Sequence, residues 1–150
     1  MVSISLISNN EFENWNTLWK KYLLFYESAI SNAVTEKTWE RIQSDKHKLY
    51  SFGAYQTDGN QKSLIGFTNF LYHPTTWSIT DYCYLEDLFV EKKFRGSGAG
   101  KALIEAVWEH CKTVGVNRLY WKTKEDNYVA RILYDRVANC SGFVEYEKEQ

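Results

Sequence analysis

The stretch from Tyr84 to Lys101, YLEDLFVEKKFRGSGAGK, constrains the fold of this chain more than any other. An apolar strand pattern over 84–90 leads through a short charged turn into a glycine-rich loop, which opens directly into a helical pattern. Backbone amides in such a loop, together with the positive end of a helix dipole, form a cradle for phosphate groups. Because Glu86 and Asp87 lie just upstream, the stretch predicts bound phosphate beside acid–base chemistry.

The first half of the chain predicts two helices and several antiparallel strands. Residues 2–6 alternate apolar and polar, which indicates a strand, and a capping box at Ser8 and Glu11 precedes apolar residues at helical spacing over 12–26. A second, shorter helix is expected to begin near Thr35. Further strands are predicted over 49–55, 63–73 and from about 77 to 90, with an Asp-Gly bend between the first two.

The second half alternates helical and strand patterns. A helix is expected from the glycine loop to near Gly115, followed by a strand at 118–123, a helix at 127–138 and a strand at 143–146. This order predicts an α+β fold, with a mixed, mostly antiparallel central sheet flanked by helices on both faces. It argues against a dinucleotide-binding fold, since no acidic residue ends a second parallel strand about 20 positions downstream. We expect one domain, 1–150.

Composition disfavours several classes of partner. The net charge is -1 with scattered Lys and Arg, so no nucleic-acid partner is expected. Cys83, Cys111 and Cys140 are odd in number and lack the spacing of a zinc site, which favours reduced cysteines and no metal. No signal-like N-terminus or long apolar run is present, so we expect a cytoplasmic protein without membrane contact.

Three segments in order carry a family resemblance. Arg95, Gly98 and Gly100 fill the signature of the GNAT superfamily of acyl-CoA-dependent N-acyltransferases, which is Arg or Gln, two residues, Gly, one residue, then Gly or Ala. YLEDLFV (84–90) resembles the corresponding strand of spermidine/spermine and thialysine acetyltransferases, and KTKEDNYVARILYDR (122–136) resembles the downstream family segment. The resemblance spans roughly 49–146. It departs from the commonest pattern at Gly142-Phe143, which comes later than usual behind an inserted RVANCS.

The resemblance implies acetyl-CoA as cosubstrate. In the family, backbone groups of the strand hold the pantetheine arm, which here points to Leu88 and Val90, and Asn127 is expected to contact the cofactor unless it only caps its helix. The diphosphate is expected at the glycine loop, at Arg95, Gly96, Gly98, Ala99, Gly100 and Lys101.

Glu86 and Tyr134 are the expected catalytic residues. An alkylammonium with a pKa near about 10 must lose a proton before it attacks a thioester, and Glu86 is predicted to accept it directly or through water. Tyr134 is expected to protonate the departing thiolate, although a tyrosine at this helix position is otherwise typical of a core. Asp87 points to the opposite face in a regular strand and would bind a cationic substrate if a bulge re-aims it.

The first helix is expected to form the acceptor wall, with Tyr22, Tyr26 and Glu27 as candidates and His73 and Trp77 near the opposite edge. The predicted function is N-acetylation of a small primary amine, such as a polyamine, diamine or amino-acid-like molecule, by direct attack in a ternary complex. A protein or histone-like peptide acetyltransferase and a non-catalytic CoA-binding sensor are the alternatives. By resemblance we also expect a homodimer formed through the C-terminal strands.

Overall fold

One mixed sheet organises the chain, and the computed structural model describes all residues 1–150. Its strands lie in the order of the sequence: β1 (Val2–Leu6), β2 (Leu49–Asp58), β3 (Gln61–His73), β4 (Tyr82–Val90) and β5 (Leu119–Tyr120). The first four strands are antiparallel, while β5 runs parallel to β4. This arrangement confirms the predicted α+β fold with a mostly antiparallel sheet.

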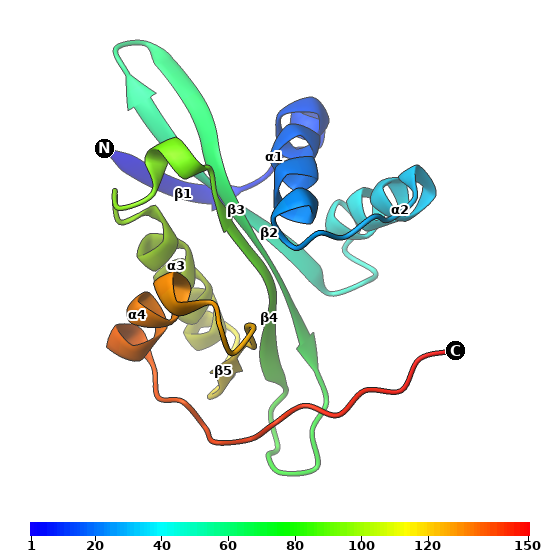
Figure 1. The fold of residues 1–150 in the computed structure, drawn as a ribbon. Coiled ribbons are helices and arrows are strands. Elements are labelled where there is room, and N and C mark those ends of the chain that lie inside the picture. The colour runs from blue at the N-terminus through cyan, green and yellow to red at the C-terminus, as the bar shows by residue number, and fades with distance from the viewer.

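Helices cover both faces of the sheet (Figure 1). On one side lie α1 (Phe12–Phe25) and α2 (Asn32–Ile42), and on the other lie α3 (Ala99–Thr113) and α4 (Tyr128–Val137). Short turns of 3-10 helix, η1 (Asn9–Glu11) and η2 (Lys92–Phe94), lead into α1 and toward α3. None of these helices is long and apolar enough to cross a membrane.

An aromatic core joins α1 to the sheet. Trp15 and Trp19 stack at 5.3 Å between ring centroids, and both pack against Phe67 of β3. The i, i+4 spacing of the two tryptophans places them on one face of the helix, as the periodicity predicted. On the opposite face of the sheet, α3 buries an apolar side that packs with Phe70 of β3 and with Cys83 and Leu85 of β4.

A β-bulge at Glu86 reverses the alternation of β4. The register pairs Phe70 with Leu85 and Asn69 with Asp87, so Glu86 is an extra residue without a partner. Leu85 accordingly packs in the α3 core, while Phe89 packs with α1. Without the bulge these two residues, four apart, would point to the same face. The bulge therefore turns Asp87 to the α1 side, the face to which Glu86 would already point in a regular strand.

The C-terminal half is less regular than the sequence predicted. The strand expected at 118–123 is limited to Leu119–Tyr120, and residues 77–81 lie outside β4. The strand expected at 143–146 is absent: the tail forms no helix or strand, although Glu145 makes an ion pair with Lys122 just beyond β5 (Figure 1). Three of its side chains, Phe143, Val144 and Tyr146, are exposed.

The second helix also begins earlier than expected. It starts at Asn32 rather than near Thr35, since Ser31 caps it by accepting a hydrogen bond from the Val34 N–H at 3.3 Å.

Candidate active site

The outer edge of β4 is open beyond Tyr84. Pairing with β5 is limited to Cys83 with Leu119 and Tyr84 with Tyr120, so the two strands diverge there. The Glu91 N–H bonds to the Ile65 carbonyl of the neighbouring strand at 2.9 Å. Since antiparallel pairs alternate between bonded and non-bonded, the main-chain groups of Leu88 and Val90 point away from β3 and toward the open edge.

The Arg95 side chain supports this direction. Its Nε donates to the Val90 carbonyl at 3.0 Å, which is possible because that oxygen takes no part in the β3 pairing. The Arg95 guanidinium also lies over the rings of Phe25 and Phe89, at 5.4 and 5.7 Å from their centroids. Arg95 therefore links the end of β4 to the end of α1.

The glycine-rich loop presents unpaired amides at the start of α3. Gly96 and Gly98 have φ of 82° and 86°, a left-handed conformation that few other residues adopt readily. The first helical bond runs from the Ala102 N–H to the Gly98 carbonyl, and the preceding four N–H groups, from Gly98 to Lys101, have no acceptor in the chain. Together with the helix dipole, these amides form a cradle suited to an anion such as a diphosphate.

Gly100 brings α4 close to this cradle. A Cβ at this position would lie 3.3 Å from Cδ2 of Leu133, so the absence of a side chain allows the close approach of α3 and α4. Ala99 is buried and can offer only its main chain, whereas the Lys101 side chain is exposed on the first turn of α3. The candidate phosphate site thus adjoins the helix that carries Tyr134.

Tyr134 is partly buried on α4, with its ring 5.5 Å from that of Trp121. Burial, and to a lesser extent the neighbouring Tyr26, raises the pKa of Tyr134 to about 12, so its phenol is protonated at neutral pH. Its hydroxyl has no hydrogen-bond partner in the chain. Asn127 immediately precedes α4, but its Nδ2 donates to Thr123 Oγ1 at 3.0 Å and its side chain does not cap the helix.

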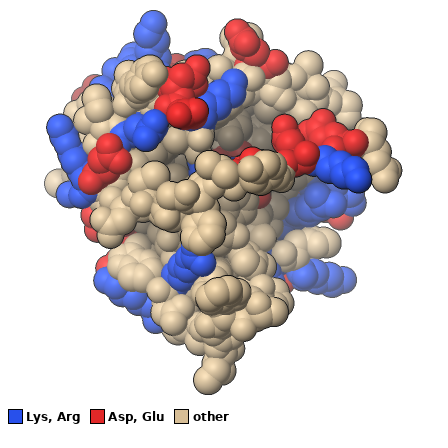
Figure 2. Space-filling view, turned by 60° about the horizontal axis from the view of Figure 1, so that its bottom comes forward, with Lys and Arg blue, Asp and Glu red and all other residues tan.

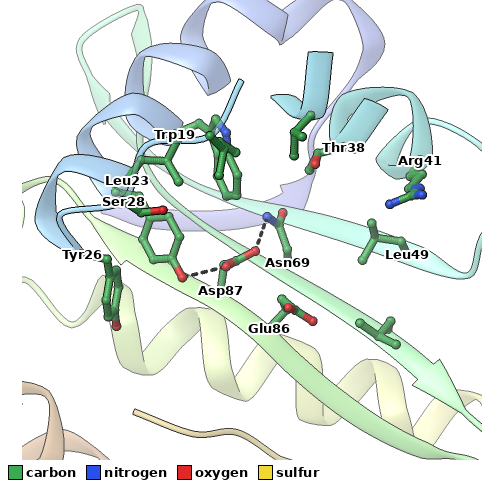
Figure 3. A pocket seen from close by; sticks show the side chains of 14 residues that line it. Trp19, Leu23, Tyr26, Ser28, Thr38, Arg41, Leu49, Asn69, Glu86 and Asp87 are labelled. Carbon is green, nitrogen blue, oxygen red and sulfur yellow. Dashed lines mark hydrogen bonds between the residues drawn. The ribbon is translucent and has the colours of Figure 1, made fainter. Parts of the chain in front are cut away.

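A cleft of about 450 Å³ lies between the C-terminal part of α1, α2 and the sheet (Figure 3). The face shown in Figure 2 is hollowed, with acidic atoms visible inside the hollow and charges of both signs interspersed around it. Fourteen residues line the cleft: Trp19, Tyr22, Leu23, Tyr26, Ser28, Ile30, Val34, Thr38, Arg41, Leu49, Asn69, Leu71, Glu86 and Asp87. The volume falls within the range of small-molecule sites.

Asp87 is held on the floor of this cleft by two donors (Figure 3). The Tyr22 hydroxyl donates to its Oδ1 at 2.7 Å, and Asn69 Nδ2 donates to its Oδ2 at 2.9 Å. Burial raises the pKa of Asp87 above its ordinary value, and the two hydrogen bonds oppose that effect. The pKa of Tyr22 is raised as well, by burial and then by the Asp87 charge. The result is a fixed carboxylate facing the α1 side.

Glu86 lines the same cleft but makes no hydrogen bond or ion pair in the chain. Its pKa is raised by burial and by the charge of Asp87, while Lys122 acts in the opposite direction. A raised pKa brings a carboxylate closer to the range useful for a general base. The bulge therefore brings two chemically different acids into one cleft, one fixed and one free.

The remaining acceptor candidates divide into two groups. Tyr22 and Tyr26 line the cleft, whereas Glu27, His73 and Trp77 do not. The His73 ring bonds to the Tyr120 hydroxyl and the Pro74 carbonyl at 2.7 and 2.8 Å, and Trp77 is 87% exposed.

Sequence reasoning missed four polar residues of the cleft: Ser28, Thr38, Arg41 and Asn69. Asn69 is 1% exposed, and its Oδ1 has no hydrogen-bond partner. An asparagine between aromatic strand residues was the available signal, because a buried amide requires partners. Arg41 carried no comparable signal. No group of three or more His, Cys, Asp or Glu side chains in the structure is arranged to hold a metal ion.

Two known N-acetyltransferases are similar to this chain in sequence. The D-amino-acid N-acetyltransferase of Saccharomyces cerevisiae is 32% identical over 147 residues, which cover 98% of this chain and 90% of the relative. The thialysine N-epsilon-acetyltransferase of Caenorhabditis elegans is 33% identical over 112 residues, covering 75% of this chain and 67% of the relative.

The fold has close counterparts among solved structures. The aminoglycoside N-acetyltransferase AAC(6')-Iy, solved in complex with CoA, superposes with a TM-score of 0.82 at 22% identity, covering 100% of this chain and 95% of the other. Residues 11–138 match the family described as acetyltransferase (GNAT), which confirms the resemblance seen in the sequence and the expected enzyme class. This chain belongs to the GNAT family of acetyltransferases.

Proposed function

We propose that this protein transfers an acetyl group from acetyl-CoA to the primary amine of a small molecule, by direct attack in a ternary complex. The bulge at Glu86 is the observation that carries the proposal. It turns Asp87 to the side of Glu86, so that two carboxylates line one cleft, while the next residues of the same strand, Leu88 and Val90, direct main-chain groups to an open edge. One strand thereby adjoins both candidate sites.

The open edge and the loop fit the chemistry of CoA. The pantetheine arm carries amides that can pair with an exposed strand edge, as the main-chain groups of Leu88 and the Val90 N–H allow, since Arg95 already bonds to the Val90 carbonyl. The diphosphate requires several N–H donors and positive charge, which the four unpaired amides from Gly98 to Lys101 and the helix dipole offer. When bound, acetyl-CoA supplies an activated acetyl thioester.

The residues around the cleft have properties suited to amine acetylation. Glu86 accepts a proton from the bound ammonium, and Asp87 favours a cation beside it. The nitrogen then forms the new N–C bond as the C–S bond breaks, while a main-chain N–H at the open edge stabilises charge on the acetyl oxygen. Tyr134 donates its phenolic proton to the departing sulfur, and the second proton that the nitrogen loses on forming the amide restores the phenol through solvent. Glu86 releases the first proton to solvent.

The two similar proteins support amine acetylation, and the C-terminal segment supports a homodimer. Both relatives are N-acetyltransferases, one named for D-amino acids and the other for the ε-nitrogen of thialysine. We also propose a homodimer in which the exposed segment 139–150 pairs with a second copy. The exposed apolar side chains of Phe143, Val144 and Tyr146 support that pairing, since they have no partner in their own chain.

A panel of amines tests the proposal. Purified protein is mixed with acetyl-CoA and, separately, with amino acids, diamines, an aminoglycoside and a histone-tail peptide, and the release of CoA thiol is followed. Acetylation of at least one small amine is the expected result. Turnover of the peptide alone would instead assign the protein-acetyltransferase function, and CoA binding without turnover of any acceptor would assign the sensor function.

A further inference from the structure

The acceptor cleft carries opposite charges at its two ends. Glu86 and Asp87 lie at one end, and Arg41 of α2 lies at the other (Figure 3). The Arg41 side chain forms no ion pair or hydrogen bond in the chain, so five N–H donors remain available to a ligand. A guanidinium is suited to bind a carboxylate through two parallel hydrogen bonds.

The strand register places two leucines between the acidic residues and Arg41. Asn69 is paired with Asp87, and Leu71 follows two residues later on the same face of β3, directly opposite Leu49 of β2. Two strand residues span about 7 Å. Figure 3 shows Leu49 between Arg41 and the two acids. An apolar floor of this length therefore lies between the positive and the negative end.

The end of the cleft at Glu86 and Asp87 is suited to bind an N–H donor of a ligand. Asn69 uses its Nδ2 to fix Asp87, which leaves its Oδ1 buried within the cleft wall without a partner. A buried amide oxygen of this kind favours a ligand N–H group. An ammonium there would meet two carboxylates and this oxygen, which together match its three N–H donors.

We propose that the acceptor is an amino acid whose reactive amine is separated from its carboxylate by several methylene groups, and that Arg41 determines this specificity by binding the carboxylate. The inference rests on the proposed acetyltransferase function and narrows its substrate class. Methylene groups of the acceptor lie on Leu49 and Leu71, the amine reaches Glu86 and Asp87, and a diamine is disfavoured because its second cation meets Arg41.

Three acceptors of matched chemistry test the proposal. ε-Aminocaproate carries an amine and a distant carboxylate, glycine carries the two groups side by side, and cadaverine has a second amine in place of the carboxylate. With wild-type protein and acetyl-CoA, kcat/KM for ε-aminocaproate should exceed that of the other two by about tenfold. Comparable values for cadaverine and ε-aminocaproate would overturn the inference.

Two variants of α2 assign the effect to Arg41. Arg41→Gln should lower the ratio of kcat/KM for ε-aminocaproate over cadaverine by about tenfold. Lys37→Gln is the matched control, since it removes one positive charge from the same helix at an exposed position outside the cleft, and it should leave the ratio unchanged. Equal ratios in Arg41→Gln and wild type would overturn the role of Arg41.

Calorimetric titration separates this inference from the proposed function. ε-Aminocaproate is titrated into wild type and Arg41→Gln in the presence of CoA, which requires no turnover. Weaker binding by the variant supports the inference even if no acceptor is acetylated, and in that case only the proposed function fails. Equal binding by the two proteins overturns the inference, whatever the turnover.

Discussion

The two candidate sites along β4 are built from different parts of the chain. The cosubstrate side consists of main-chain groups: unpaired amides at the start of α3 and the open edge at Leu88 and Val90. The acceptor side consists of side chains from α1, α2, β3 and β4, held by contacts such as Tyr22 to Asp87. Main-chain recognition depends on a few residues close together in sequence, whereas side-chain recognition depends on segments that only the fold brings together.

Tyr134→Phe should give the largest effect, because we propose that Tyr134 serves the chemistry rather than binding on either side. We expect kcat to fall about a hundredfold with little change in the KM for acetyl-CoA, which steady-state kinetics can measure. Tyr84→Phe is a matched control, since burial also raises the pKa of Tyr84 to about 12 while the residue lies where β4 pairs with β5. Equal losses in kcat and in acetyl-CoA affinity would remove Tyr134 from the acid role.

Gly98→Val should damage the cosubstrate side selectively. A β-branched residue is strained at φ of 86°, so the loop must rearrange and its amides must move. We expect acetyl-CoA to bind about tenfold more weakly, as measured by calorimetry. Gly59→Val introduces similar strain at φ of 56° in the β2–β3 turn, again with no neighbouring atom within 4 Å, and should lower stability without weakening acetyl-CoA binding. Equal weakening in both variants would contradict the selective role of the loop.

Asp87→Asn should raise the Tm of the protein at neutral pH and lower its acetyltransferase activity. Burial raises the pKa of Asp87 in the folded protein above its unfolded-state value. The protonated carboxyl group therefore contributes fully to folding stability below the unfolded-state pKa, and this contribution is lost as the pH rises through the folded-state pKa. An amide stays neutral, and Asn69 can turn its unpaired Oδ1 toward it. We expect Tm at pH 7 to rise by a few degrees, with the gain disappearing toward about pH 4.

Asp58→Asn is the control for this stability effect, because Asp58 is an exposed carboxylate at the β2–β3 turn. It should leave Tm nearly unchanged across the same pH range. A lower Tm of Asp87→Asn at pH 7 would show that the hydrogen bonds from Tyr22 and Asn69 outweigh the cost of burial.

This contrast between the two sides also explains what the sequence could predict. Periodicity identified β1, α1 and the β2–β3 hairpin, and the spacing of Arg95, Gly98 and Gly100 identified the loop, because each signal lies within one short segment. The fold class followed from the order of these elements. The strand at 143–146 was predicted wrongly, because a short apolar segment indicates a strand only where another strand is available to pair with it.

The acceptor side could be predicted only in part. The sequence raised a bulge as a condition for Asp87 to face the cleft, but whether one forms depends on how β4 packs against β3 and α1. Arg41 is an ordinary arginine of a surface helix until α2 is placed beside Leu49. Glu27, Asn127 and the loop residues retain their predicted roles as proposals.

The pH dependence of kcat for wild type and Glu86→Gln tests the central claim most directly, that a cleft carboxylate takes the proton from an amine. Both proteins are assayed at saturating acetyl-CoA and acceptor between pH 6 and 9.5. The wild type should reach a plateau once Glu86 is ionised, whereas the variant should gain about tenfold per pH unit, because it depends on the small fraction of bound amine that is already deprotonated. Parallel profiles of equal height would contradict the claim.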